Sequence, residues 1–291
     1  MSDNQPKIGL ALSGGGSRGY AHIGVIKILE QNNIPIDFIA GASAGALIGS
    51  LYSFFKDCEK VEKVLLGNDL AKFINLVIDP SFEGGLIKGD KVKNFLVQTF
   101  GGASFGELKI LFRAIATNFD TAEACVLSEG DLASAVQASA AFPLVFKPVS
   151  LGEQLLWDGS LSNPVPVNVV RQMGADIVIA VNLYNKSAFE VRTKDRKEGV
   201  YEIAARAIEA LQYSLAQEHL KGADIVIDPS VAGLGILDLD KFLGDRGEKI
   251  ILQGEKAAVE ALPKIKEAIG KFNRSNRGAG GFLRNIGKFR L

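Results

Sequence analysis

The chain has 291 residues and a formal net charge of zero, with 33 Lys and Arg against 33 Asp and Glu. This length is enough for a substantial core, and the balance excludes the strong positive field typical of nucleic-acid-binding proteins, so we expect no nucleic acid partner. Two cysteines cannot form a disulfide framework and the N-terminus lacks a signal-peptide pattern, so we expect a reduced, cytoplasmic protein. With only His22 and His219 available, most metal sites lack ligands, and we expect no metal.

The first candidate site is a glycine loop near the N-terminus. An apolar run at 7–13, typical of a strand covered on both faces, leads into Gly14-Gly15-Gly16-Ser17-Arg18-Gly19, and 20–32 is helix-like. The main-chain N–H groups of such a loop can stabilise an oxyanion. Arg18 is either a nearby positive charge with a direct role or a solvated or structurally paired side chain. The spacing of Gly14, Gly16 and Gly19 also fits the G-x-G-x-x-G fingerprint of dinucleotide-binding folds. Such a fold needs an acidic residue near the end of the second strand to bind the ribose, but the nearest acid, Asp37, lies where that strand begins.

The second candidate site is the stretch 38–48, FIAGASAGALI. An apolar strand-like segment passes through Gly41-Ala42-Ser43-Ala44-Gly45 into a helix-like segment, the order of a G-x-S-x-G turn that presents a nucleophilic serine. The flanking glycines let the backbone take a strained corner, and we predict that Ser43 is a nucleophile. Two alternatives remain: a transmembrane helix at 38–55, which is uncharged and has G-x-x-x-G spacing, and a buried turn with an inert serine.

The third candidate is Asp158, within LLWDG at 155–159. Three large apolar residues before it and a glycine after it should remove it partly from water, which raises the pKa of a carboxyl group. A raised pKa suits a general base that takes the proton of a serine near neutral pH. The alternative is an ordinary Asp-Gly turn.

Between these sites the pattern predicts a helix at 58–78, a break at 79–85 and a helix at 90–100. The apolar residues within 73–105 either form a cover over an apolar acyl pocket or belong to the ordinary core. Strands are expected at 110–118 and 124–127, and a helix at 131–139 with Asp131 as its cap. The small residues at 138–143 indicate tight packing.

In the last third we expect a helix at 167–173, strands at 177–181 and 225–227, a polar loop at 185–199 and the longest helix at 201–220. A final helix at 248–269 should break or restart at Pro263. We expect an acyl hydrolase domain at 1–270 and a basic tail at 271–291, which carries six basic residues and no acidic one. The tail either contacts an anionic membrane from the cytoplasmic side, docks on its own domain or stays disordered.

In this order, the glycine loop, the serine turn, the 138–143 stretch and Asp158-Gly159 resemble the bacterial patatin-like phospholipases over residues 7–181. The resemblance implies a three-layer α/β/α fold with a mainly parallel central sheet, acyl lipid substrates (phospholipids, lysophospholipids or related esters) and no cofactor. One departure is Ser160, where the family commonly has Gly or Ala. The implied site comprises a Ser43–Asp158 dyad, an oxyanion hole of Gly14, Gly15 and Gly16, and supporting residues Arg18, Gly19, Gly41, Gly45 and Gly159.

A Ser43, Asp158, His219 triad in α/β-hydrolase order is the remaining mechanistic alternative. Since His219 follows a long helical pattern instead of a strand, we expect it on a solvated helix end, and we expect His22 to be packed. A nucleotide-binding or regulatory module that uses Gly14 to Gly19 as a phosphate cradle remains the main alternative function, and a membrane-docked scaffold that acts through the basic tail is a third. The sequence leaves head group, chain length and oligomeric state open.

Overall fold

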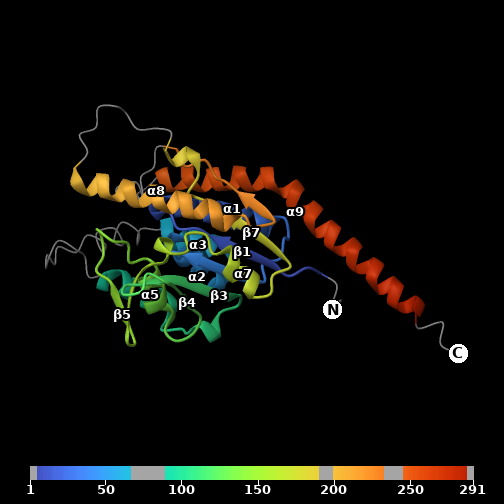
Figure 1. The fold of residues 1–291 in the computed structure, drawn as a ribbon, viewed down its shortest axis with the longest axis horizontal. Helices are drawn as coiled ribbons and strands as arrows, with labels where there is room; N and C mark the ends of the chain where they lie inside the picture. The colour runs from blue at the N-terminus through green and yellow to red at the C-terminus, as the bar shows by residue number, and fades with distance from the viewer. Residues whose placement is uncertain (1–4, 67–88, 190–198, 233–244, 287–291) are drawn as a thin grey trace.

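The computed structural model describes residues 5–66, 89–189, 199–232 and 245–286, without side chains at 245–246 and 276–286. The described strands form an eight-stranded sheet of order β5-β6-β3-β2-β1-β7-β8, with β4 paired to β3 (Figure 1). The strands are β1 (Ile8–Leu12), β2 (Phe38–Ala42), β3 (Leu111–Asn118), β4 (Ala124–Leu127), β5 (Val149–Leu151), β6 (Gln154–Asp158), β7 (Ile177–Val181) and β8 (Ile225–Ile227).

The sheet is mainly parallel, as predicted. Strands β3, β2, β1, β7 and β8 run in parallel, and the antiparallel pairings are confined to β4, β5 and β6 beside β3. The helices are α1 (Tyr20–Gln31), α2 (Ala44–Phe55), α3 (Cys58–Leu66), α5 (Asp90–Phe100), α6 (Leu132–Ser139), α7 (Val167–Gln172), α8 (Val200–Leu220) and α9 (Asp245–Ile286), with short 3₁₀ turns η1 (Gly16–Gly19), η2 (Phe105–Glu107), η3 (Gly159–Leu161) and η4 (Lys186–Phe189).

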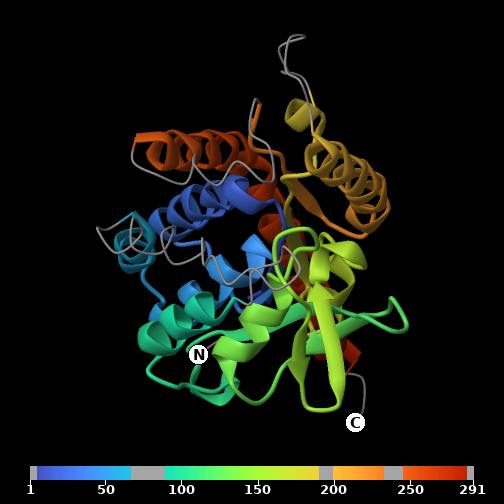
Figure 2. The ribbon, with the colours of Figure 1, turned by 90° about the vertical axis from the view of Figure 1, so that its left-hand side faces the viewer.

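Helices cover both faces of the sheet, which gives three layers (Figure 2). Side chains alternate across β1: Leu10 and Leu12 pack in a cluster with residues of α1, α3 and α9, whereas Ala11 packs with residues of α7 and α8. The strand is therefore buried on both sides, as a continuous apolar run predicts. The expected three-layer α/β/α fold is confirmed.

Several local expectations hold. Asp131 caps α6 by accepting a hydrogen bond from the Ser134 main-chain N–H at 2.8 Å. Strands β4, β7 and β8 have the predicted bounds. Outside the described residues lie the second part of the helix predicted at 58–78, the predicted break at 79–85, residues 73–88 of the expected acyl-pocket cover and the middle of the 185–199 loop.

The transmembrane alternative for 38–55 is wrong. Its first residues form β2, and Ser43 separates this strand from α2, which has 12 residues. Among the described helices, none combines the length and the hydropathy needed to cross a bilayer. The uncharged stretch is apolar because β2 and α2 are both largely buried in the fold.

The predictions for the C-terminal helix were wrong in two respects. Helix α9 has 42 residues and so exceeds the 21 residues of α8, and it continues through Pro263 instead of breaking there. Proline removes one main-chain hydrogen bond, but the flanking Ala261 and Ile265 are buried against the fold, and this packing holds the helix.

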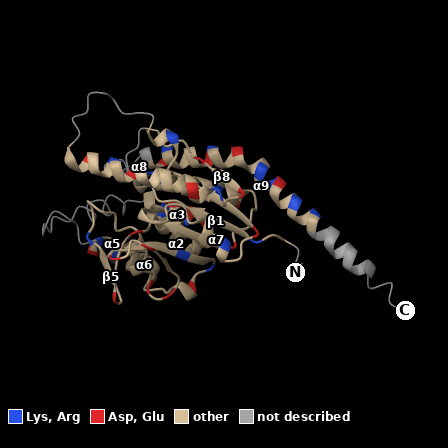
Figure 3. Ribbon diagram, viewed as in Figure 1, with Lys and Arg blue, Asp and Glu red and all other residues tan. Residues whose placement is uncertain are grey.

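Helix α9 also crosses the expected domain boundary at 270–271 without interruption and extends away from the rest of the fold (Figure 1). Positive and negative side chains both occur along its part up to residue 275 (Figure 3). Because the side chains beyond that point are not described, the membrane contact of the basic tail stays a prediction.

Two glycines allow α9 to pack closely on α1. A β-carbon on Gly254 would lie 2.0 Å from the Ala21 carbonyl oxygen, and one on Gly24 would lie 2.0 Å from the Ile251 carbonyl oxygen. Main-chain atoms of the two helices are therefore in direct contact, without side chains between them. This contact fixes α9 against the face that carries α1.

We expect Gly254→Ala to lower the free energy of unfolding by about 2 kcal/mol, because the new methyl group must push the two helices apart. Gly270→Ala is the matched control in the same helix, since a β-carbon there meets nothing closer than 3.5 Å. This control should raise stability by about 0.5–1 kcal/mol through helix propensity. Urea unfolding followed by circular dichroism measures both. Equal effects of the two substitutions would contradict the close α1–α9 contact.

Candidate active site

Ser43 lies on a strained turn between β2 and α2. Its backbone has φ 52° and ψ −120°, a conformation that a non-glycine residue adopts only when its surroundings enforce it. The neighbouring glycines make this turn possible: a β-carbon on Gly41 would lie 2.3 Å from the Gly45 carbonyl oxygen, and one on Gly45 would lie 2.2 Å from the Leu12 carbonyl oxygen. The turn thus brings the end of β2 and the start of α2 against the end of β1.

The Ser43 main chain is held from a distant part of the sequence. Its N–H donates to the Ser139 hydroxyl oxygen at 3.0 Å, and the Ser139 hydroxyl donates to the Ile115 carbonyl oxygen at 2.5 Å. Ser139 is fully buried at the end of α6, and Ile115 belongs to β3. One hydroxyl group therefore connects the serine turn to the neighbouring strand.

Asp158 lies at the end of β6, and its main chain is fixed on both sides. Its N–H donates to the Ala141 carbonyl oxygen at 3.1 Å, and its carbonyl oxygen accepts from the Thr117 hydroxyl at 2.8 Å. The side chain is completely buried. Oδ1 accepts from the Ser160 main-chain N–H at 2.8 Å, whereas Oδ2 has no partner of acceptable hydrogen-bond geometry among the described residues.

The structure brings Ser43 and Asp158 together. Burial raises the pKa of Asp158 from 3.8 to about 6, and hydrogen bonding from the Ser43 hydroxyl and from Ser160 partly opposes this rise. The expected direction and cause of the pKa shift are both confirmed. The Ser43 hydroxyl therefore lies close to the Asp158 carboxyl group, although Oδ2 has no aligned hydrogen bond among the described residues.

The three loop glycines have different surroundings. The Gly14 N–H donates to the Pro164 carbonyl oxygen at 3.1 Å and is therefore already used. Gly15 and Gly16 have φ of 151° and 57°, and their N–H groups make no hydrogen bond to another described residue. These two amides are thus the available main-chain donors at the start of η1.

Arg18 is a structurally paired side chain. It is completely buried in an ion pair with Glu209 of α8, and its Nη1 lies 3.5 Å from the Leu183 carbonyl oxygen. Glu209 also accepts from Arg206 at 2.9 Å. Buried charges of this kind need a partner, so Arg18 ties the glycine loop to α8 and to the segment after β7.

The supporting glycines Gly19 and Gly159 both permit close approach. A β-carbon on Gly19 would lie 2.7 Å from the β-carbon of Ala44, next to Ser43, and one on Gly159 would lie 2.0 Å from the Ile115 carbonyl oxygen. The glycine loop, the serine turn and the Asp158 turn are therefore packed against one another or against β3.

The position of neither histidine suits a general base for Ser43. His22 is buried with Nε2 2.8 Å from the Ser13 carbonyl oxygen, and burial lowers its pKa to about 4. His219 lies in the last turn of α8, as predicted, but it is half-buried instead of fully solvated, and burial lowers its pKa as well. No interaction between His219 and Asp158 is among those that shift either pKa.

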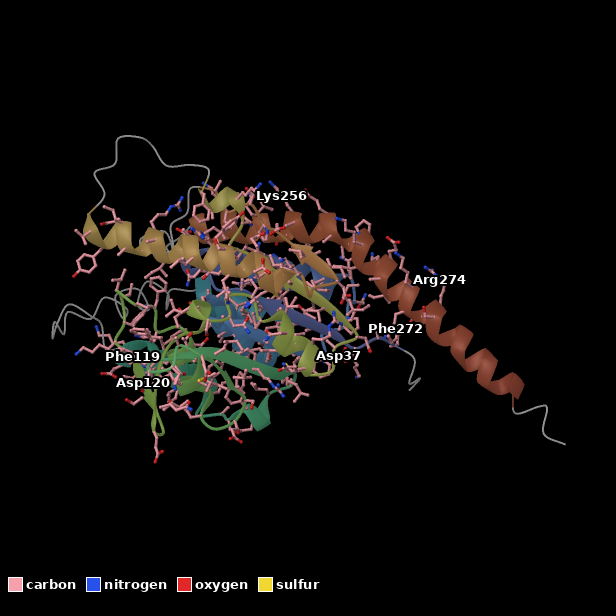
Figure 4. All side chains as sticks on the ribbon, viewed as in Figure 1. Asp37, Phe119, Asp120, Lys256, Phe272 and Arg274 are labelled. Carbon is pink, nitrogen blue, oxygen red and sulfur yellow. The ribbon has the colours of Figure 1, made fainter. Side chains whose placement is uncertain are left out.

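Asp37 does not suit a nucleotide site. Its Oδ2 accepts from the Ile8 main-chain N–H at 2.8 Å, and its Oδ1 pairs with Lys7 at 3.1 Å. Asp37 lies at the edge where the parallel strands begin, opposite Phe119 and Asp120, which follow the end of β3 (Figure 4). Among the described residues there is also no cluster of three or more side chains suited to hold a metal ion.

Two residues that contact this site escaped the sequence analysis. Ser139 was assigned to tight packing only, and it lies 96 positions from Ser43, so no local pattern links them. Tyr184, buried just after β7, received no role, although the charge of Asp158 raises the pKa of its hydroxyl in addition to burial. Only three-dimensional proximity identifies these two.

Comparison with known proteins agrees with this architecture. The chain is 32% identical over 192 residues to an uncharacterised NTE family protein of Mycobacterium bovis, covering 65% of this chain and 52% of that protein. It is 30% identical over 181 residues to lysophospholipase NTE1 of Debaryomyces hansenii, covering 60% of this chain and 12% of the relative. The chain thus spans about half the length, or less, of these curated relatives.

In fold, the chain is similar to VipD from Legionella pneumophila, with a TM-score of 0.63 and 15% identity over 89% of this chain and 67% of VipD. The family model of patatin-like phospholipases matches residues 10–171, more than half of the chain. This range includes the glycine loop, the serine turn and Asp158. The chain therefore belongs to the patatin-like phospholipase family.

Proposed function

We propose that the chain is a serine acyl hydrolase that cleaves carboxylic ester bonds of acyl lipids, such as phospholipids or lysophospholipids, through an acyl-Ser43 intermediate. The observation that carries the proposal is the contact between a serine on a strained turn and a fully buried carboxyl group whose pKa is about 6. The similarity to a protein named lysophospholipase supports the choice of substrate class.

In the first half of the reaction, Ser43 Oγ attacks the ester carbonyl carbon while its proton passes to the Asp158 carboxylate. The carbonyl oxygen becomes an oxyanion, for which the Gly15 and Gly16 N–H groups are the available donors. Gly14 has no N–H to offer, since that group is bonded to Pro164. When the tetrahedral intermediate collapses, the bond to the alcohol breaks, the alcohol takes the proton from Asp158, and the acyl group stays on Ser43.

In the second half, the Asp158 carboxylate takes a proton from a water molecule, whose oxygen attacks the acyl carbon. The same two amides stabilise the second oxyanion. Its collapse breaks the bond to Ser43 Oγ, which regains the proton from Asp158, and the fatty acid leaves. Asp158 thus alternates between base and acid, a role that suits a pKa near neutrality.

We expect Ser43→Ala to lower ester hydrolysis by about a thousandfold or more and to abolish covalent labelling by a fluorophosphonate probe, because the attacking oxygen is removed. Ser50→Ala is the matched control in α2, the helix that follows Ser43, since the buried Ser50 hydroxyl donates to the Leu47 carbonyl oxygen at 2.9 Å. An aryl ester assay and gel fluorescence measure both effects. Labelling of the Ser43→Ala protein at the wild-type rate would refute the nucleophile.

Asp158→Asn should also remove activity, and the wild-type rate should fall as pH drops through about 6, because protonated Asp158 cannot accept a proton. Through the same carboxyl group, the stability of the wild-type protein should change in the opposite direction to its rate and increase as pH drops. Because the pKa of Asp158 is raised, the folded state holds this proton more tightly than the unfolded state does. The free energy of unfolding of the protein therefore falls as pH rises from 3.8 to about 6.

Asp158→Asn should therefore unfold at higher urea concentration than wild type at pH 8, an advantage that disappears near pH 4. Urea titrations at the two pH values measure this difference. A variant that is both inactive and less stable at pH 8 would indicate that Asp158 mainly supports the fold.

His219→Gln, alone and combined with His22→Gln, should keep the rate within a factor of about three of wild type, because neither imidazole is among the groups that shift the pKa of Asp158. Steady-state ester hydrolysis at pH 8 measures this, with circular dichroism to verify folding. A loss with His219→Gln comparable to that of Ser43→Ala would select the Ser, Asp, His triad instead.

A further inference from the structure

Ser160 places a buried hydroxyl group directly beside the catalytic carboxyl group. Its side chain is 1% exposed, and its main-chain N–H donates to Asp158 Oδ1 at 2.8 Å. Its Oγ and the other carboxyl oxygen, Asp158 Oδ2, are both buried without an aligned partner among the described residues. A buried polar atom without a hydrogen bond costs about 1–3 kcal/mol, which favours a bond between such neighbours.

A second hydroxyl group lies beside the first. A β-carbon on Gly14 would stand 2.0 Å from Ser160 Oγ and 2.7 Å from the Tyr184 hydroxyl oxygen. Both oxygens therefore converge on one point next to Gly14, close enough for a direct hydrogen bond or a single bridging water. Tyr184 is 1% exposed and comes from the segment after β7, whereas Ser160 belongs to η3.

The direction of hydrogen bonding follows from the charges. Burial, and then the charge of Asp158, raises the pKa of Tyr184, so its hydroxyl keeps its proton and acts as a donor. Hydrogen bonding from the Ser160 main chain and hydroxyl lowers the pKa of Asp158 against the larger effect of burial. A carboxylate accepts hydrogen bonds only, so Ser160 must donate to it, and the Ser160 oxygen remains able to accept from Tyr184.

We infer that Ser160 and Tyr184 are positioning residues that form a relay, in which the Tyr184 hydroxyl donates to Ser160 and the Ser160 hydroxyl donates to the Asp158 carboxylate. The relay stabilises the ionised base and leaves Ser43 as the group to be deprotonated. When Asp158 carries the serine proton, the Ser160 hydroxyl is released and can turn toward the tyrosine oxygen. This inference rests on the proposed function, in which Asp158 is the base.

Charged side chains near the site do not account for the pKa of Asp158. Arg18 and Glu209 act on Tyr184 with opposite signs. None of the titratable side chains on the elements that pack against the Asp158 turn is among the interactions that shift its pKa. These side chains are Arg113 on β3 and Tyr201, Glu202, Arg206, Glu209, Tyr213, Glu218 and His219 on α8; α6 carries none.

The test is the pH dependence of two rates, fluorophosphonate labelling of Ser43 and hydrolysis of an aryl ester. Ser160→Ala should move the acid limb of both profiles upward by about 0.5 pH unit or more, because the carboxylate loses a donor. Tyr184→Phe should move it in the same direction by a smaller amount. The double variant should match Ser160→Ala, because Tyr184 acts only through Ser160.

Thr117→Val is the matched control, since Thr117 bonds the carbonyl oxygen of Asp158 and not its carboxyl group. It should lower stability without moving the acid limb. Ser160→Gly provides a second variant that also lacks the hydroxyl. If Ser160→Ala and Ser160→Gly lower the rates but leave both acid limbs at the wild-type pH, Ser160 only supports packing and the relay is refuted.

A readout without catalysis separates this inference from the proposed function. In the Ser43→Ala background, adding Ser160→Ala should lower the free energy of unfolding at pH 8, where the folded carboxyl group is ionised. The effect should be much smaller near pH 4, where the folded carboxyl group is protonated with or without Ser160 and the unfolded state is the same for both proteins. A difference that does not change with pH refutes the relay. If wild type shows no esterase activity while the pH-dependent difference persists, the proposed function fails and the hydroxyl–carboxylate contact stands.

Discussion

The exclusion of water from the Asp158 carboxyl group is the constraint on which the rest of the site depends. In water this group would be a weak base with an ordinary pKa, whereas burial brings its pKa to about 6. The same burial makes the ionised form costly for the fold, so the surrounding main chain must hold the group firmly. Hydrogen bonds from β3 and to the segment after α6 do so, and hydroxyl and main-chain groups of Ser43 and Ser160 contact the carboxyl group itself.

Close contact between main chains brings the three parts of the site together. The glycine loop follows β1, the serine turn follows β2, and the Asp158 turn packs on Ile115 of β3, so three adjacent strands each contribute at the same edge. Side chains larger than hydrogen would separate these segments by the width of a methyl group or more. The buried Arg18–Glu209 pair adds a charged tie from this edge to α8, so the donors of the glycine loop have little freedom to move.

The sequence was informative where a local pattern has a local cause. The apolar runs of β1 and β7, the Asp131 cap, the glycines around Ser43 and the apolar residues before Asp158 each predicted the observed structure or the direction of a pKa shift. The sequence did not predict features that depend on packing between segments far apart in the chain. Helix α9 passes through Pro263 because its neighbours are buried, and Ser139 meets Ser43 only because α6 ends beside β3.

Helix α9 extends from the fold on the side away from Ser43. Phe272 and Arg274 lie beyond Asp37, on the side where the parallel strands begin, whereas Ser43 follows the other end of β2 (Figure 4). A bead, a sensor chip or a fused protein coupled through this helix would therefore lie away from the edge that carries Ser43. Immobilised in this orientation, the molecule would present Ser43 to the medium, where micelles and vesicles too large to pass beneath the protein could still reach it.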